Sequence, residues 1–146
     1  MKKYIFLGLI FSALSFHGFS QNWVTNFSEA KQLASDKNQN IILVFQGSDW
    51  CAPCIKLDKE IWSTEAFIKL SKNHFIMLKA DFPRKKANKL SKELTEQNGK
   101  LAEAYNPQGY FPLVVVLDKN GKVLGKTGYE KTTPNDYFTK LIAFEH

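Results

Sequence analysis

Cysteine and histidine are scarce in this sequence, whose 146 residues include two cysteines and three histidines. Two cysteines cannot supply the several cross-links of a disulfide-stapled scaffold, and a chain of this length does not need them to fold. A structural zinc site takes four ligands, whereas the sequence has no second cysteine pair and only dispersed histidines. The composition therefore disfavours a structural metal site and leaves Cys51 and Cys54 as one closely spaced pair.

Repeats, low-complexity stretches, internal linkers and a strong net charge are also missing. The hydrophobic content of 44% is enough for the core of one domain. The net charge of +6 is spread over dispersed lysines, which favours solubility over a nucleic-acid site. Arg84, Lys85 and Lys86 form one short basic cluster, which we expect to be a solvated helix start or loop rather than a phosphate or nucleic-acid contact.

An apolar run at residues 4–14 follows two lysines near the N-terminus. This pattern is typical of a secretory signal peptide, and we expect residues 1–20 to be removed by cleavage after Ser20. An uncleaved membrane anchor is the alternative, but the run is shorter than the roughly 20 residues that span a bilayer. Cleavage removes both lysines and no acid, so the mature domain, residues 21–146, has a net charge of +4. In an exported chain, one close cysteine pair is expected to be redox-active.

The stretch from Ile41 to Cys54 carries most of the functional information. Its first five residues are apolar and predict a strand buried on both faces. A Gly-Ser-Asp turn follows, and the next helix is expected to begin near Cys51. Free N–H groups and the helix dipole at that point favour a thiolate, so we expect the pKa of Cys51 to fall below that of an ordinary thiol. The sequence predicts an exposed attacking thiol at Cys51 and a more sheltered resolving thiol at Cys54, one helical turn later.

The sequence Trp-Cys-Ala-Pro-Cys behind a buried strand resembles the active site of the thioredoxin superfamily. The wider segment Gly-Ser-Asp-Trp-Cys-Ala-Pro-Cys-Ile-Lys-Leu-Asp-Lys-Glu is most similar to the exported bacterial members of that superfamily. The resemblance runs from about Phe27 to the C-terminus. It implies an α/β thioredoxin fold, in which helices flank a central mixed β-sheet on both faces, and a periplasmic location.

A second segment, Tyr105 to Leu117, carries the same resemblance through a helix-ending Tyr, a Gly-containing loop and a proline that opens an apolar strand. The resemblance identifies Pro112 as the superfamily's cis-proline, packed against the active-site disulfide. X–Pro bonds are the common site of cis peptides, and the backbone of Phe111 is then expected to bind a substrate peptide in an extended form. A trans proline that merely opens an edge strand is the alternative.

Hydrophobic periodicity and turn residues predict the order helix, strand, active-site helix, strand, helix, strand, strand, helix. Asn22 to Thr25 is too short to assign as a strand. Asn98-Gly99 is a candidate interruption of the helix expected at residues 87–105. The predicted elements are a helix at 27–35, a strand at 41–45, a helix from 51 with a second helical segment at 64–71, a strand at 75–80, a helix at 87–105, a hairpin at 114–117 and 122–128, and a helix from 133.

Phe45 departs from the pattern of the superfamily. Many thioredoxins have a buried Asp six residues before the first cysteine, and it accepts the proton of the second thiol. Lys79, Asp81 and Asp58 are the candidates to replace it. A general base must lie within hydrogen-bond reach of the thiol, so the sequence leaves the base unassigned.

These observations predict a thiol–disulfide oxidoreductase of the bacterial cell envelope that acts on protein disulfides. Cys51 would attack the substrate disulfide, and Cys54 would resolve the mixed disulfide. Trp50, Phe111 and Pro112 would contact the substrate. We expect a monomer that needs neither cofactor nor metal.

The direction of electron flow is expected to be reductive, because Ala52-Pro53 supplies no cation to stabilise the thiolate strongly. A membrane or soluble thiol partner would then supply electrons. Two alternatives stay open. One is a metal-binding chaperone that uses both cysteines as ligands, and the other is a non-catalytic peptide-binding domain with a structural disulfide.

Overall fold

The computed structural model describes residue 18 and residues 20–146. Most of the predicted signal peptide, residues 1–17 and 19, therefore lies outside the described residues. Within the described part, no helix has both the length and the apolar character that crossing a membrane requires.

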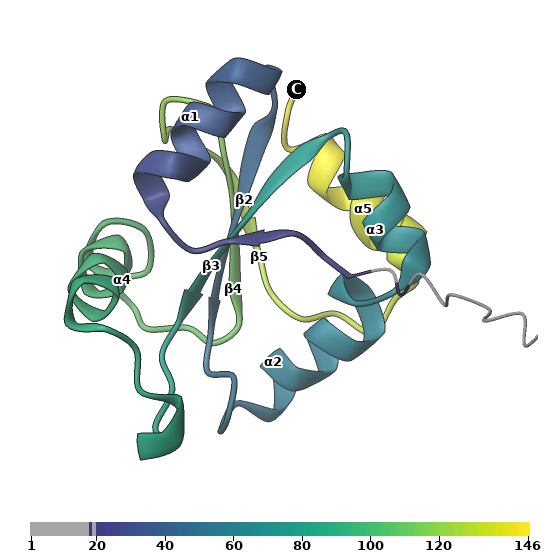
Figure 1. The fold of residues 1–146 in the computed structure, drawn as a ribbon. Coiled ribbons are helices and arrows are strands. Elements are labelled where there is room, and N and C mark those ends of the chain that lie inside the picture. Colours follow the sequence, from purple (N-terminus) through teal and green to yellow (C-terminus); the bar gives the residue numbers. More distant parts are fainter. Residues whose placement is uncertain (1–17, 19) are drawn as a thin grey trace, which may run out of the picture.

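A five-stranded mixed sheet forms the centre of the fold, with the strand order β1-β3-β2-β4-β5 (Figure 1). The central strand β2 pairs in parallel with β3 and antiparallel with β4, and β4 forms a hairpin with β5. This confirms the predicted mixed sheet. The strands are β1 (Trp23–Val24), β2 (Asn40–Gln46), β3 (Phe75–Asp81), β4 (Leu113–Leu117) and β5 (Val123–Thr127).

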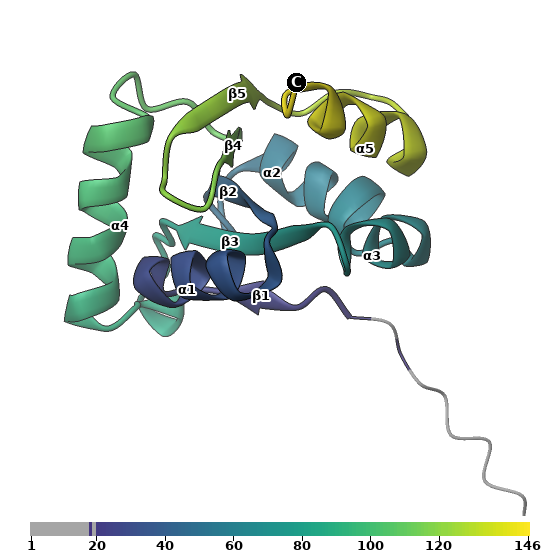
Figure 2. The same cartoon turned by 90° about the horizontal axis from the view of Figure 1, so that it is seen from above.

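Helices cover both faces of this sheet, as Figures 1 and 2 show. α1 and α4 lie on one face, where Ala34 and Leu101 join the first core cluster. α2, η1, α3 and α5 lie on the other, where Leu57, Phe67 and Tyr137 join the second cluster. The predicted layers are confirmed. The helices are α1 (Phe27–Lys37), α2 (Ala52–Leu57), the π-helix η1 (Asp58–Trp62), α3 (Glu65–Ser71), the 3-10 helix η2 (Lys86–Asn88), α4 (Lys92–Tyr105) and α5 (Pro134–Ala143).

β2 contributes to both cores, which explains its unbroken apolar sequence. Ile41, Leu43 and Phe45 belong to the first cluster, and Ile42 and Val44 belong to the second. Side chains alternate between the faces of a strand, and helices cover both faces here. Each of the five is therefore at most 1% exposed.

The prediction of one helix over residues 87–105 is wrong. The chain forms the short helix η2, leaves helical geometry at Lys89 with ψ 128°, and begins α4 only at Lys92. Ser91 provides the new start because its hydroxyl accepts the N–H of Leu94 at 3.2 Å. The break leaves residues 82–91 as a loop that contains η2 and follows β3.

Asn98-Gly99 does not interrupt α4. Asn98 is buried, and its side-chain amide donates to the carbonyl oxygen of Asp81 at 3.0 Å. This hydrogen bond between Asn98 and Asp81 anchors α4 to the end of β3.

The segment Trp23–Val24 forms the strand β1, which pairs with β3. Two residues are too few to give a periodic signal in the sequence.

Candidate active site

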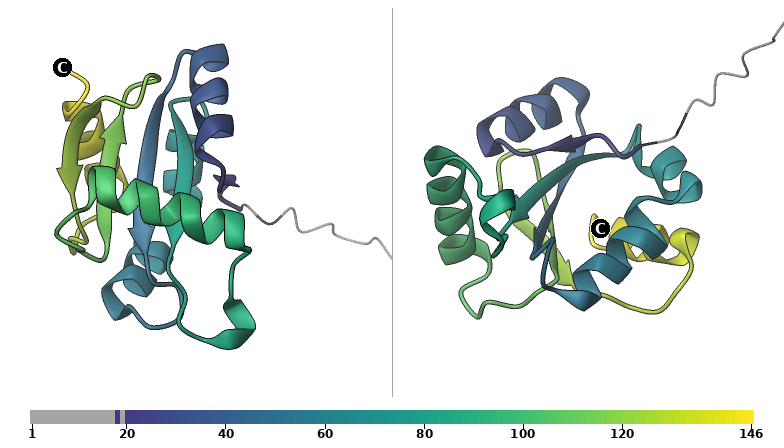
Figure 3. Two further views of the ribbon diagram at one scale, coloured as in Figure 1. Left: turned by 90° about the vertical axis from the view of Figure 1, so that its left-hand side faces the viewer. Right: turned by 60° about the horizontal axis from the view of Figure 1, so that its bottom comes forward.

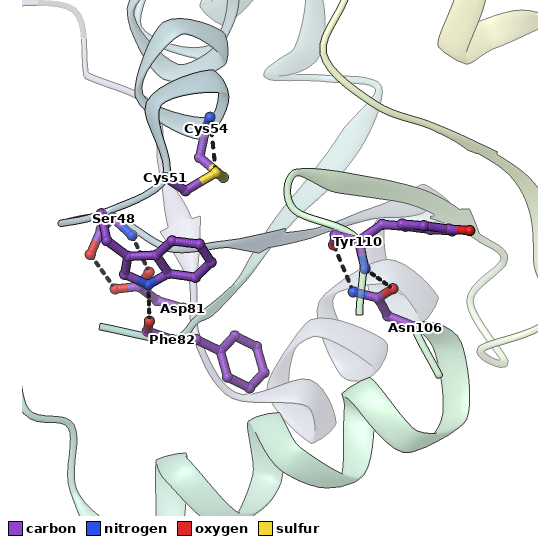
Figure 4. The surroundings of a disulfide bond; sticks show 8 residues. Ser48, Cys51, Cys54, Asp81, Phe82, Asn106 and Tyr110 are labelled. Carbon is purple, nitrogen blue, oxygen red and sulfur yellow. Dashed lines mark hydrogen bonds between the residues drawn. A yellow bond between two sulfur atoms is a disulfide. The ribbon is translucent and has the colours of Figure 1, made fainter. Parts of the chain in front are cut away.

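The two cysteines lie where β2 ends and α2 begins (Figure 4). Cys51 is the N-cap residue of α2 with extended backbone, φ −91° and ψ 99°. Its sulfur accepts the N–H of Cys54 at 3.3 Å, and its own N–H donates to the carbonyl oxygen of Gly47 at 2.9 Å. The predicted position at the first helical turn is confirmed, and a free N–H of the helix points at the sulfur of Cys51.

Cys51 and Cys54 form a disulfide, with their Cα atoms 5.2 Å apart. Both residues are 4% exposed. The expectation of an exposed Cys51 beside a more sheltered Cys54 is therefore wrong for the oxidised pair, because each cysteine is covered to the same extent. What distinguishes them is position: Cys51 caps the helix, and Cys54 lies inside its first turn.

Trp50 is held in place by contacts on several sides. Its indole N–H donates to the carbonyl oxygen of Phe82 at 2.7 Å, and its ring centroid lies 5.4 Å from that of Phe111. The guanidinium carbon of Arg84 lies 3.8 Å from the ring centroid. Beneath the ring is Gly47, where an added Cβ would come within 2.2 Å of the indole. Only glycine leaves room for Trp50 in this position.

Replacing Gly47 by Ala is expected to displace Trp50 and break its hydrogen bond to Phe82. We expect a loss of about 1–3 kcal/mol of stability, as for overpacking. Gly99→Ala is the matched control, because nothing lies within 4 Å of the added carbon. That control should be neutral or stabilising, since alanine favours a helix over glycine. Thermal unfolding checks both variants, and an unchanged melting temperature of the Gly47→Ala protein would contradict the packing argument.

The peptide bond between Phe111 and Pro112 is cis, as the resemblance to the thioredoxin superfamily implies, and the trans alternative is wrong. Phe111 lies between two rings, with its centroid 5.4 Å from that of Trp50 and 5.4 Å from that of Phe82. The structure thus brings Phe111 against Trp50, the residue before Cys51, while Pro112 is buried directly before β4. The rings of Trp50, Phe82 and Phe111 form an apolar cluster.

Asn106 shapes the loop before the cis peptide, and sequence reasoning missed it. Its side-chain amide donates to the carbonyl oxygen of Tyr110 at 2.8 Å and accepts the N–H of Tyr110 at 2.9 Å (Figure 4). Asn106 is 2% exposed, whereas Tyr110 on the same loop is 62% exposed. The Asn-Pro pair at positions 106 and 107 was the available signal, since such pairs favour turns.

Asp49 is a second residue that the sequence did not single out. One carboxylate oxygen accepts the N–H of Arg84 at 2.9 Å, and the other accepts the N–H of Lys85 at 2.9 Å and the amide of Asn88 at 3.0 Å. These bonds, first of all the one from the Arg84 backbone, lower the pKa of Asp49 to about 2. Asp49 therefore clamps the loop after β3 onto the loop that carries Trp50.

This clamp predicts a pH dependence. The folded pKa of Asp49, about 2, is below the ordinary value of 3.8. The stabilisation is therefore fully present above about pH 4 and is lost as the pH falls toward 2. Asp49→Asn should lower the melting temperature at neutral pH, and the gap to wild type should narrow below pH 4. Asp36→Asn, at an exposed site on α1, is the control at neutral pH. A gap that stays constant from pH 7 to 3 would contradict the assignment.

Phe45 occupies the place of the missing carboxylate, fully buried and stacked on Phe82 with ring centroids 6.4 Å apart. Asp81 accepts the N–H of Ser48 at 2.9 Å and its hydroxyl at 2.6 Å. Asp81 therefore serves as a second clamp on the active-site loop.

Lys79 lies over the ring of Trp23, with its Nζ 4.5 Å from the ring centroid. Burial lowers the pKa of Lys79, while the nearby charges of Asp58 and Asp81 oppose that shift. Asp58 accepts the hydroxyl of Ser63 at 3.2 Å. Among the hydrogen bonds of the described residues, none joins Lys79, Asp58 or Asp81 to Cys54, so the structure selects none of the three as its base.

Residue 18 and residues 20–146 contain no group of three or more His, Cys, Asp or Glu side chains arranged to hold a metal ion. Within the described chain, Cys51 and Cys54 therefore belong to no such group of potential metal ligands.

The sequence profile of the thioredoxin-like family matches residues 22–119. The chain therefore belongs to the thioredoxin-like family. Its similarity to named disulfide oxidoreductases, together with the bonded Cys51–Cys54 pair, identifies it as a thiol–disulfide oxidoreductase. The disulfide bond reductase DsbH of Chlamydia pneumoniae is 33% identical to it over 116 residues, which are 80% of this chain and 68% of that protein.

Solved structures agree with this assignment. A DsbH oxidoreductase superposes with a TM-score of 0.80 at 28% identity, covering 94% of this chain and 92% of the other. A disulphide isomerase from Xylella fastidiosa Temecula1 shares the fold, with a TM-score of 0.60 at 23% identity over 82% of this chain and 88% of the other. These matches confirm the thioredoxin fold predicted from the sequence.

Proposed function

We propose that this protein reduces disulfides in other proteins, with Cys51 as the attacking and Cys54 as the resolving thiol. The observation that carries the proposal is the disulfide-bonded Cys51–Cys54 pair at the start of α2, preceded by Trp50, whose ring contacts Phe111. Similarity to a protein named a disulfide bond reductase supports the reductive direction.

The reaction begins with the reduced pair. The thiolate of Cys51 attacks one sulfur of the substrate disulfide, a mixed disulfide forms, and the other substrate sulfur leaves as a thiolate that takes up a proton. Cys54 then loses its proton and attacks the sulfur of Cys51. The substrate departs as a dithiol, and the bonded pair seen in the structure is the product state. Two electrons and two protons from a thiol partner restore the enzyme.

The start of α2 contributes to the first step. The N–H of Cys54 donates to the sulfur of Cys51, and the free N–H groups of the first turn carry partial positive charge. Both favour the thiolate as attacking species and as leaving group. Trp50, Phe111 and Pro112 are the proposed substrate contacts, with the backbone at Phe111 pairing with an extended substrate chain.

We place this reaction in the periplasm. Residues 1–20 have the composition of a signal peptide, which leaves residues 21–146 as the working domain, and we propose that this domain acts as a monomer. The similarity to a protein named a disulfide bond reductase supports disulfide-bearing substrates. A membrane or soluble thiol relay is the proposed electron source.

Insulin reduction with dithiothreitol as the electron donor tests the proposal. Wild-type protein should speed the precipitation of the insulin B chain, whereas the Cys51→Ala/Cys54→Ala variant should match the protein-free rate. The couple should have a reduction potential nearer to about −270 mV than to about −120 mV, since these values mark a reductant and a strong oxidant. Peptide binding without turnover would favour the non-catalytic alternative. Stoichiometric metal in reduced protein would favour the chaperone.

A further inference from the structure

Four basic side chains gather next to the active-site tryptophan. Arg84, Lys85, Lys86 and Lys89 are all exposed, and they follow β3 on the loop that contains η2. In the part of the chain that the structure describes, none of the four takes part in a salt bridge. The sequence suggested only a solvated helix start or loop for the first three. In the structure, the loop that carries them contacts Trp50.

This basic loop is fixed to the active-site loop rather than free in solvent. Asp49 accepts the backbone N–H groups of Arg84 and Lys85, each at 2.9 Å. Trp50 donates to the carbonyl oxygen of Phe82 at 2.7 Å, and the Arg84 guanidinium lies on its ring. Figures 1 and 3 show η2 at the same end of the molecule as the turn between β2 and α2. Trp50, the residue before Cys51, thus contacts the basic loop through Phe82 and Arg84.

The same loop surrounds a hollow of about 280 Å³. Phe82, Pro83 and Leu90 give it apolar walls, and the four basic residues also line it. Asp81 is the one acidic residue in its lining, and both of its oxygens already accept hydrogen bonds from Ser48. The hollow therefore offers apolar walls and an excess of positive charge, and two of its residues, Phe82 and Arg84, contact Trp50.

We infer that this loop selects protein substrates with acidic residues flanking the disulfide to be reduced. The inference rests on the proposed reductase function. A substrate chain that lies on Trp50 and Phe111 extends past Arg84, so its carboxylates come near four cations as its disulfide reaches Cys51. Attraction of this kind raises the rate of productive encounter and favours one class of partner over another.

Two synthetic peptides test this directly. They carry the same disulfide, and one has two glutamates on each side where the other has glutamines. Wild type should reduce the acidic peptide with a kcat/KM about tenfold higher at low salt. The preference should shrink in 1 M salt, where the screening length falls to about 3 Å.

The charge variant Lys85→Gln/Lys86→Gln/Lys89→Gln should bring the ratio of the two kcat/KM values to within about twofold of one. It should keep the loop in place, because Asp49 holds that loop by backbone N–H groups and Asn88. Lys37→Gln/Lys119→Gln/Lys122→Gln is the matched control. It removes the same charge from exposed lysines at the opposite end of the sheet, and it should keep the wild-type ratio.

Equal rates for the two peptides with wild type, or a ratio lost equally in the control, would overturn the inference. So would sedimentation of wild type with anionic phosphatidylglycerol vesicles combined with a peptide ratio of one, since the patch would then serve a membrane. Failure of wild type to reduce either peptide would instead overturn the reductase function itself.

Discussion

Changing Cys54 to Ser is expected to leave the substrate covalently attached to Cys51. Without the second thiol, the mixed disulfide has no internal attacker and waits for external thiol. The Cys54→Ser variant should therefore accumulate a stoichiometric adduct with a disulfide substrate, visible by mass spectrometry and on a non-reducing gel. Its turnover should fall to the background rate.

Cys51→Ser is the matched control for this trap. It removes the thiol at the helix N-cap and keeps the one inside the first turn, so it should form no comparable adduct. An adduct that forms on Cys54 in this variant, at a rate similar to that on Cys51, would contradict the assigned roles. The result is informative because both cysteines are equally covered in the oxidised state, at 4% exposure.

Trp62→Ala is expected to cause the largest loss of stability, about 3–5 kcal/mol, which is typical of removing a buried aromatic side chain. Trp62 is fully buried in η1. Its ring contacts those of Trp23, Phe67 and Tyr137 edge-on, with centroids 6.2, 4.9 and 5.4 Å away. The substitution should also loosen the active-site helix, because η1 continues directly from α2.

Trp62→Phe separates packing from hydrogen bonding. In the structure the indole N–H of Trp62 is buried without a hydrogen-bond partner, so its removal breaks no such bond. This variant should lose clearly less stability than Trp62→Ala and keep its activity. Denaturant unfolding of both proteins gives the comparison. A Trp62→Phe protein as unstable as Trp62→Ala would show that the indole N–H is satisfied after all.

The elements that could be predicted from the sequence are those with a local signal. The apolar run of β2 showed a strand covered on both faces, and the Cys-Ala-Pro-Cys segment showed a helix start with Cys51 at its cap. The resemblance to the thioredoxin superfamily implied the cis peptide at Pro112, and the structure has it. For the strand and the helix start, neighbouring residues carry the signal, whereas the cis peptide was expected from the family resemblance.

The features that sequence reasoning missed depend on contacts between distant segments. β1 is a strand only because β3 offers it a free edge. The helix expected over residues 87–105 is broken because Asp49 holds the loop near Arg84 and Ser91 starts a new helix. The exposure of Cys51 was wrong because burial depends on which groups pack over the sulfur. The hydrophobic periodicity of a sequence does not show contacts between distant segments.

The titration of Cys51 in the reduced protein tests the central claim most directly, namely that the start of α2 stabilises a thiolate there. Ultraviolet thiolate absorbance and the pH dependence of alkylation measure it, with Cys54→Ser isolating the single thiol. Cysteines activated in this way titrate between about 3.5 and 7.5, and an ordinary thiol titrates near about 8.5. A Cys51 pKa within the lower range is the predicted result, and an ordinary value would contradict the account.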